Sequence, residues 1–162
     1  MTDHILLRHR DIADIHKLNI YQKDGGYSAF KKVLTQMEPA QVLEEVKSSG
    51  LRGRGGAGFP TGIKWSFLPG NIFPHYVVAN ADESEPGTFK DREILESNPF
   101  LFLEGLAIAS YAVKANTAYI YLRGEFWQVA AFLDDCIRQL EGEGLLGENL
   151  FGTGYSLRIF TH

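Results

Sequence analysis

The first group of residues suited to ligand binding or catalysis lies in a glycine-rich segment, positions 50–70. This segment holds seven of the chain's 17 glycines. Gly53, Gly55 and Gly58 match the pattern G-x-G-x-x-G. That fingerprint requires a strand before it and a helix after it. Here a helical pattern precedes the glycines and Pro60 follows them, and no Gly-Lys-Ser/Thr completes a Walker loop. We therefore predict a shaped loop that is neither an ordinary Rossmann turn nor a Walker loop.

Two cations and two aromatic rings flank these glycines. Arg54 and Lys64 are the cations, and Phe59 and Phe67 carry the rings. Backbone N–H groups without side chains around them, next to cations, suit an anionic nucleotide, and the rings can stack on a heterocycle. The alternative is that the glycines only permit tight packing and that the rings, Phe67 above all, belong to the core.

A second polar cluster follows a short apolar strand that we expect at residues 75–82, buried on both faces. The cluster comprises Asn80, Asp82, Glu83 and Glu85. In open α/β sheets, ligands bind at the carboxyl ends of strands. Carboxylates accept hydrogen bonds from ribityl or ribose hydroxyls and from ring N–H groups, so the cluster suits the polar tail of a cofactor. A magnesium site and a solvated acidic turn are the alternatives.

The elements that must position both clusters follow from hydrophobic spacing and capping residues. Residues 1–24 are polar and weakly patterned, and we expect an extended arm there. The expected elements, in order, are a helix with the stripe Tyr27, Phe30, Val33 and Leu34, a helix from Pro39 ended by Gly50, the strand at 75–82, a helix capped by Asn98 and running to about Lys114, a strand at 118–123, a helix at 125–140, and a strand at 155–161. Alternating strands and helices predict an open parallel α/β sheet.

Composition excludes several classes of protein. A net charge of -4 with 44% hydrophobic and 22% charged residues is unlike a disordered tail or a nucleic-acid binder. The most apolar stretch, 100–113, contains Glu104 and is too short to span a bilayer, and the first residues lack a signal-peptide pattern, which favours the cytoplasm. The single cysteine, Cys136, cannot supply the four thiolates of an iron–sulfur cluster, and we expect it to be buried.

Two long strings in this sequence carry a family resemblance. Residues 50–65 (GLRGRGGAGFPTGIKW) and 80–92 (NADESEPGTFKDR) resemble those of the flavin-carrying, NADH-oxidising subunit of respiratory complex I, an NADH-quinone oxidoreductase. Similar strings occur in diaphorase subunits of NAD-reducing hydrogenases and formate dehydrogenases, and residues 119–125 and 144–149 also fit. The resemblance implies a Rossmann-like FMN-binding fold with flanking helices, of which residues 25–162 would be the N-terminal part, incomplete at the C-terminal edge of the sheet.

The resemblance also assigns roles by motif position. Gly53, Gly55, Lys64, Asn80, Asp82 and Glu83 would contact FMN, Phe59 and Phe67 would hold the adenine of NADH, and Glu85 would lie near the nicotinamide half. The remaining loop residues of the predicted cofactor site are Arg54, Gly56, Ala57, Gly58, Pro60, Thr61 and Gly62. Hydride passes between the two cofactors in such enzymes, so we expect no catalytic side chain and no metal ligand.

Family members continue with a second cofactor loop and with the cysteines that bind a 4Fe-4S cluster, and this sequence has neither. We therefore expect iron–sulfur partner subunits in the peripheral arm of a membrane complex, with no direct membrane span and no nucleic acid. We also expect the 162-residue chain alone neither to hold FMN tightly nor to oxidise NADH. A non-redox nucleotide-binding module and a structural interaction domain are the rival functions.

Overall fold

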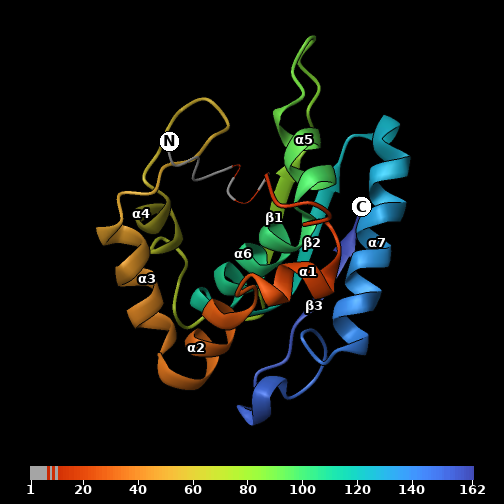
Figure 1. Cartoon of the computed structure of the whole chain (residues 1–162). Helices are drawn as coiled ribbons and strands as arrows, with labels where there is room; N and C mark the ends of the chain where they lie inside the picture. Colours follow the sequence, from red (N-terminus) through yellow and green to blue (C-terminus); the bar gives the residue numbers. More distant parts are fainter. Residues whose placement is uncertain (1–6, 8, 10) are drawn as a thin grey trace.

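The computed structural model describes residues 7, 9 and 11–162, which form a three-stranded sheet covered by helices (Figure 1). The elements in order are α1 (Leu18–Lys23), α2 (Ser28–Gln36), α3 (Pro39–Ser48), α4 (Thr61–Trp65), β1 (His75–Ala81), α5 (Lys90–Ser97), α6 (Pro99–Ala112), β2 (Ala115–Leu122), a 3-10 turn (Gly124–Phe126), α7 (Trp127–Gly142), a second 3-10 turn (Leu150–Gly152) and β3 (Arg158–Thr161).

The three strands pair in the order β1-β2-β3, and both pairs are parallel. Val78 lies opposite Tyr119, which in turn lies opposite Phe160. Helices α5 and α6 connect β1 to β2, and α7 connects β2 to β3. The predicted open parallel α/β sheet is therefore confirmed, although β3 begins at Arg158 rather than at Tyr155.

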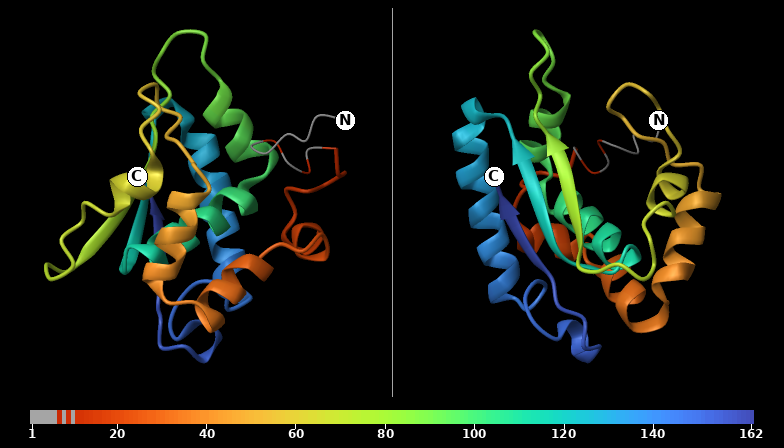
Figure 2. Two further views of the ribbon diagram at one scale, coloured as in Figure 1. Left: turned by 90° about the vertical axis from the view of Figure 1, so that its left-hand side faces the viewer. Right: turned by 180° about the vertical axis from the view of Figure 1, so that it is seen from behind.

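The helices cover only one face of this sheet, and the other face is open to solvent in the right-hand view of Figure 2. The large apolar side chains exposed on it are Tyr76, Val78, Tyr119, Tyr121 and Phe160. The prediction that the first strand is buried on both faces is wrong. Two successive crossovers of the same hand, progressing in the same direction across a sheet, place their helices on the same side.

The main core lies between the sheet and α6 and α7. Ala118, Ile120 and Leu122 of β2 are buried there against Leu103 of α6 and Leu133 of α7. The amino-terminal end of α6 forms as its sequence predicts: Pro99 is the first residue, and the Asn98 side-chain oxygen accepts a hydrogen bond from the Leu101 N–H at 3.3 Å. The α6 helix thus lies between the sheet on one side and α1 and α2 on the other.

The predicted helices before the glycine loop are also confirmed. The four residues of the predicted stripe, Tyr27 immediately before α2 and Phe30, Val33 and Leu34 within it, are all buried. Helix α3 begins at Pro39, and Gly50 follows its end with φ 69°, the left-handed conformation that glycine adopts without strain.

The expected extended arm is wrong where the structure describes it. Residues 18–23 form α1, and Ile15, Leu18 and Tyr21 are buried in the main core. These three apolar residues recur every third position, so one face of the segment packs against α6. The part of the arm at residues 1–6, 8 and 10 lies outside the described residues.

A buried carboxylate joins the amino-terminal helices to α6. Glu104 of α6 is 6% exposed and accepts a hydrogen bond from the Tyr21 hydroxyl at 2.6 Å. It also accepts from the backbone N–H groups of Tyr27 at 2.9 Å and Phe30 at 3.1 Å. The carboxylate therefore satisfies donors at the start of α2, where negative charge is favourable. Burial and the charge of Glu104 raise the pKa of Tyr27 well above its usual value.

Replacing Glu104 with alanine should lower the free energy of unfolding by about 3 kcal/mol, because three buried donors lose their acceptor. Urea denaturation followed by circular dichroism measures this loss. Glu104→Gln, whose amide oxygen can still accept a hydrogen bond, should retain part of the stability. Glu141→Ala on the exposed side of α7 is the control and should change stability by less than about 0.5 kcal/mol. Equal stability of Glu104→Ala and Glu141→Ala would contradict this account.

Candidate functional site

The glycine-rich segment between α3 and α4 is a loop closed at its base by hydrogen bonds. The Gly53 N–H donates to the Phe59 carbonyl at 2.9 Å, and the Thr61 N–H donates to the Leu51 carbonyl at 2.8 Å. The Arg52 guanidinium adds a hydrogen bond to the Gly58 carbonyl at 3.0 Å. The two arms of the loop are thus fixed to each other, and residues 54–57 form its tip.

The tip presents bare backbone to solvent. Residues 53–57 are all exposed. Within the described part of the chain, the N–H groups of Gly55, Gly56 and Ala57 donate no hydrogen bond. Gly56 has φ 117° and Gly58 has φ 61°, so both positions need glycine, whereas a Cβ on Gly55 would meet no atom within 4 Å. The tip can therefore approach an anionic ligand closely through its N–H groups.

The cations and rings of the loop are also available to a ligand. Arg54 and Lys64 are exposed, and among the described residues neither side chain forms an ion pair or a hydrogen bond. The rings of Phe59 and Phe67 lie together with their centroids 6.0 Å apart and are 46% and 68% exposed. The alternative that these rings belong to the core is wrong.

The loop is followed directly by α4, a five-residue helix that is not among the elements expected from the sequence pattern. Gly62 is buried in it, and a Cβ there would lie 2.6 Å from the Lys47 backbone nitrogen, so glycine lets α4 pack tightly on α3. Pro60 and Thr61 are half-buried at the start of α4. The structure gives Gly62 a packing role, and its predicted contact with a cofactor stays a prediction.

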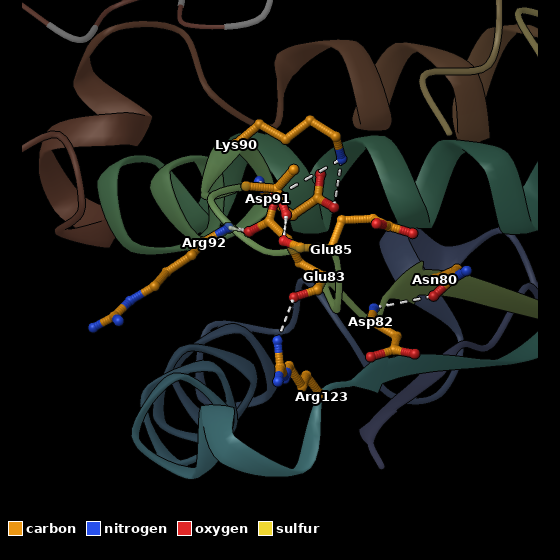
Figure 3. Close-up of polar contacts among 9 residues, drawn as sticks. Asn80, Asp82, Glu83, Glu85, Lys90, Asp91, Arg92 and Arg123 are labelled. Carbon is orange, nitrogen blue, oxygen red and sulfur yellow. Dashed lines mark hydrogen bonds and ion pairs between the residues drawn. The ribbon is translucent and has the colours of Figure 1, made fainter. Parts of the chain in front are cut away.

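The acidic cluster lies at the carboxyl end of β1, as predicted (Figure 3). The Asn80 side-chain oxygen accepts a hydrogen bond from the Asp82 N–H at 3.0 Å, and the Ser84 hydroxyl donates to an Asp82 carboxylate oxygen at 2.5 Å. The side chains of Asn80, Asp82 and Glu85 are exposed. Their oxygens are therefore accessible to hydroxyl or N–H donors of a ligand.

Glu83 differs from its two acidic neighbours. It is 5% exposed, and its carboxylate oxygens accept hydrogen bonds from the Asp91 N–H at 3.0 Å and the Arg92 N–H at 3.2 Å. Lys90 Nζ lies 3.9 Å from one of these oxygens. The carboxylate thus caps the amino terminus of α5, as Figure 3 shows. The predicted contact between Glu83 and FMN stays a prediction.

Arg123 is the residue at this edge whose role sequence reasoning missed. Its Nε and Nη2 donate to the two Glu125 carboxylate oxygens at 2.8 and 3.0 Å, and its Nη1 donates to the Glu83 carbonyl at 3.1 Å. The hydrogen bond with Glu125 raises the pKa of Arg123 and lowers the pKa of the Glu125 carboxyl group. Its position immediately after β2, at the ligand-binding edge of a parallel sheet, was the signal available in the sequence.

The glycine loop and the acidic cluster lie at the same end of the molecule in all three views of Figures 1 and 2. No hydrogen bond or ion pair joins residues 50–67 to residues 80–92, both of which the structure describes in full. Each segment is instead anchored to its own neighbours, α3 and α4 for the loop and β2 and α5 for the cluster. The prediction that both segments contact one ligand stays a prediction.

Other candidate groups do not form a site. Cys136 is buried in α7, as predicted, and burial with the nearby Asp135 charge raises its thiol pKa to about 12. Among the described residues, no three His, Cys, Asp or Glu side chains are grouped as metal ligands would be, so the magnesium alternative has no preformed ligand set. Within the same part of the chain, no helix has both the length and the apolar character to cross a bilayer.

F subunits of NADH-quinone oxidoreductase from three bacteria match nearly the whole chain. The F subunit of Aquifex aeolicus is 49% identical over 98% of the chain, and the F 2 subunit of Rhizobium meliloti is 46% identical over 100% of it. The F subunit of Escherichia coli is 44% identical over 90% of the chain. The chain spans only 37%, 39% and 33% of the length of these three relatives, respectively.

Solved structures show the same architecture. NAD+-reducing NiFe-hydrogenase in the air-oxidised state superimposes with a TM-score of 0.69 and 31% identity, covering 98% of this chain and 24% of that one. The H2-reduced state gives a TM-score of 0.65 and 36% identity, covering 76% of this chain and 21% of that one. The model of the Nuo51 FMN-binding domain matches residues 46–160, which contain both the glycine loop and the acidic cluster. The chain therefore belongs to the Nuo51 FMN-binding domain family.

Proposed function

We propose that this chain provides one side of the FMN and NADH site of an NADH dehydrogenase of the NADH:quinone oxidoreductase type. The observation that carries the proposal is that two exposed groups of opposite chemistry lie at the same end of the molecule, one of them at the carboxyl end of a parallel strand. The glycine loop offers free N–H groups, cations and rings, and the acidic cluster offers amide and carboxylate oxygens. This division suits ligands that have phosphates at one end and hydroxyls and heterocycles elsewhere.

Each segment would hold a different part of the cofactors. The tip N–H groups of Gly55 and Gly56, with Arg54 and Lys64, would bind phosphate oxygens, because all of these donors are exposed and unused. The Phe59 and Phe67 rings would stack on the adenine of NADH. Across the site, Asn80 and Asp82 would accept hydrogen bonds from ribityl hydroxyls, and Glu85 would face the nicotinamide nucleotide.

FMN held by these residues would supply the redox chemistry, which is two-electron oxidation of NADH coupled to one-electron reduction of iron–sulfur clusters. The residues of this chain would bind and orient the two cofactors without carrying protons or electrons themselves. The buried Cys136, with its raised pKa, is unsuited to ligate a cluster. The clusters, including a 4Fe-4S centre, would therefore be bound by other residues of the complex, with iron–sulfur subunits as partners in a cytoplasmic peripheral arm.

A diaphorase subunit of an NAD-reducing hydrogenase is a second candidate function. The superposition on NAD+-reducing NiFe-hydrogenase supports it, because the same fold can serve either complex. The two candidates share the cofactor site and differ only in the acceptor of the electrons. Activity of the purified complex with a quinone or with hydrogen distinguishes them.

An absorbance spectrum of the protein purified from its native source tests the shared proposal. A flavin band near 450 nm that bleaches on addition of NADH is the expected result. A flavin band that NADH leaves unchanged would indicate a flavoprotein with another reductant. Absence of any flavin would favour the rival functions, a non-redox nucleotide-binding module or a structural interaction domain.

Replacing Gly55 with valine should abolish flavin retention in the purified holoenzyme. The added side chain has free space in the protein and needs no unusual backbone angle, so its effect would come from blocking the ligand rather than from misfolding. Flavin content per protein is measured from absorbance after gel filtration. Gly70→Val, at a glycine with equally free space outside the loop tip, is the matched control and should retain flavin. Full flavin occupancy of the Gly55 variant would refute the role of the loop.

Replacing Glu85 with glutamine should change the KM for NADH, or its pH dependence, more than it changes flavin content. The Glu85 side chain is exposed and caps no helix, so the nucleotide alone would lose a charged neighbour. Steady-state kinetics and flavin absorbance measure the two quantities. Glu141→Gln on α7 is the control. Loss of flavin with unchanged kinetics in the remaining holoenzyme would instead place Glu85 at the flavin.

The 162-residue chain alone should bind FMN with a dissociation constant above about 1 μM, equivalent to less than roughly 8 kcal/mol of binding free energy. The loop tip and the polar groups at the end of β1 are exposed. A flavin ring bound there would therefore remain exposed to solvent on the side facing away from the protein. Calorimetric titration with FMN measures the constant. Tighter binding would show that these two segments suffice for the site.

A further inference from the structure

We propose that Arg123 is a positioning residue that holds the acidic turn, defined as residues 82–85, in the orientation that the cofactors require. This inference rests on the proposed function and adds to it a residue on a different strand. Arg123 is joined to the turn through a backbone atom, the Glu83 carbonyl, at 3.1 Å. The role is therefore to orient the turn.

The register of the sheet explains why Arg123 reaches the turn. Ala81, the last residue of β1, lies opposite Leu122, the last residue of β2. The next residue along each strand, Asp82 on one and Arg123 on the other, leaves the sheet at the same level. The parallel pairing of β1 and β2 thus brings the guanidinium beside the turn, and the charge of Asp82 contributes to the raised pKa of Arg123.

The guanidinium is itself fixed in one orientation. Glu125 accepts from Nε at 2.8 Å and from Nη2 at 3.0 Å, which is the bidentate geometry of an arginine–carboxylate pair. With these two nitrogens engaged, Nη1 is left to face the Glu83 carbonyl, as Figure 3 shows. A lysine at this position keeps the positive charge, but a single ammonium group cannot reproduce the planar fork together with the third contact.

Glu83 is consequently held at two points. Its side chain is bound to the start of α5, and its carbonyl is bound to Arg123. Its neighbours in the turn, Asp82 and Glu85, have exposed carboxylates. The backbone direction at Glu83 decides where both carboxylates point, so a loss of the Arg123 contact would move them together while the α5 cap keeps the turn attached.

Arg123→Lys in the holoenzyme purified from its native source separates geometry from charge. We expect about a tenfold rise in the KM for NADH and a similarly faster loss of flavin on dilution. The kcat of the molecules that retain flavin should stay within about twofold, because orientation of the turn affects binding of the cofactors. Arg138→Lys, which alters an exposed arginine paired with Asp135 on α7, is the matched control and should change none of these values.

A second substitution tests the fork independently. Glu125→Gln leaves Arg123 and its charge in place but weakens the bidentate pair, so we expect a smaller shift of the same values in the same direction. In the double variant, the KM for NADH and the rate of flavin loss should rise no further than in Arg123→Lys alone, since both changes act through one contact. If Arg123→Lys does not fold, Glu125→Gln alone tests the proposal: a raised KM for NADH with faster flavin loss supports it, and wild-type values of both overturn it.

The outcomes are distinguishable. Suppose that the wild-type protein retains flavin and that both variants have the wild-type KM for NADH and the wild-type rate of flavin loss. This result would overturn the role of Arg123 and leave the proposed function standing. A drop in kcat at constant KM would also overturn it, because Arg123 would then act on the reaction itself. Wild-type protein without flavin would overturn the proposed function and this inference with it.

Discussion

The parallel pairing of three strands is the constraint on which the candidate site depends. Because β1 and β2 run in the same direction, their carboxyl ends meet at one edge, and Asp82 and Arg123 leave the sheet side by side. An antiparallel partner in place of β2 would bring its amino terminus to this edge instead. The same topology sends the crossover helices to one face and leaves the aromatic face bare. The site chemistry and the shape of the fold therefore have a common origin.

Two buried carboxylates perform the same task at the starts of two different helices. Glu104 accepts hydrogen bonds from the start of α2, and Glu83 accepts them from the start of α5. Each replaces water as the partner of helix-terminal N–H groups, so each can be buried at low cost. Neither carboxylate belongs to the helix that it caps. Both thus join elements that are distant in sequence or separated by a turn, and Glu83 does so in the middle of a cluster whose other acids are exposed.

Local patterns predicted most of the fold. The proline and asparagine at the start of α6, the glycine after α3 and the apolar stripe of α2 are short-range signals, and each formed as expected. The uncovered sheet face, the burial of α1 and the roles of Glu83 and Arg123 were not predicted. Those features depend on which segments meet in space. In the sequence, Glu83 is indistinguishable from Asp82 and Glu85, since only the placement of α5 selects one acid of the three for burial.

The closed base of the glycine loop has a consequence for the conformational entropy of ligand binding. Its arms are already joined through Gly53, Phe59, Leu51 and Thr61, and the packing of Gly62 on Lys47 fixes the following helix. Only the tip at residues 54–57 is left to lose backbone freedom, and ordering a residue costs roughly 1–2 kcal/mol. An equally long loop without the base contacts would lose that freedom over its whole length. The scaffold thus confines the entropic penalty to the few residues whose N–H groups face the ligand.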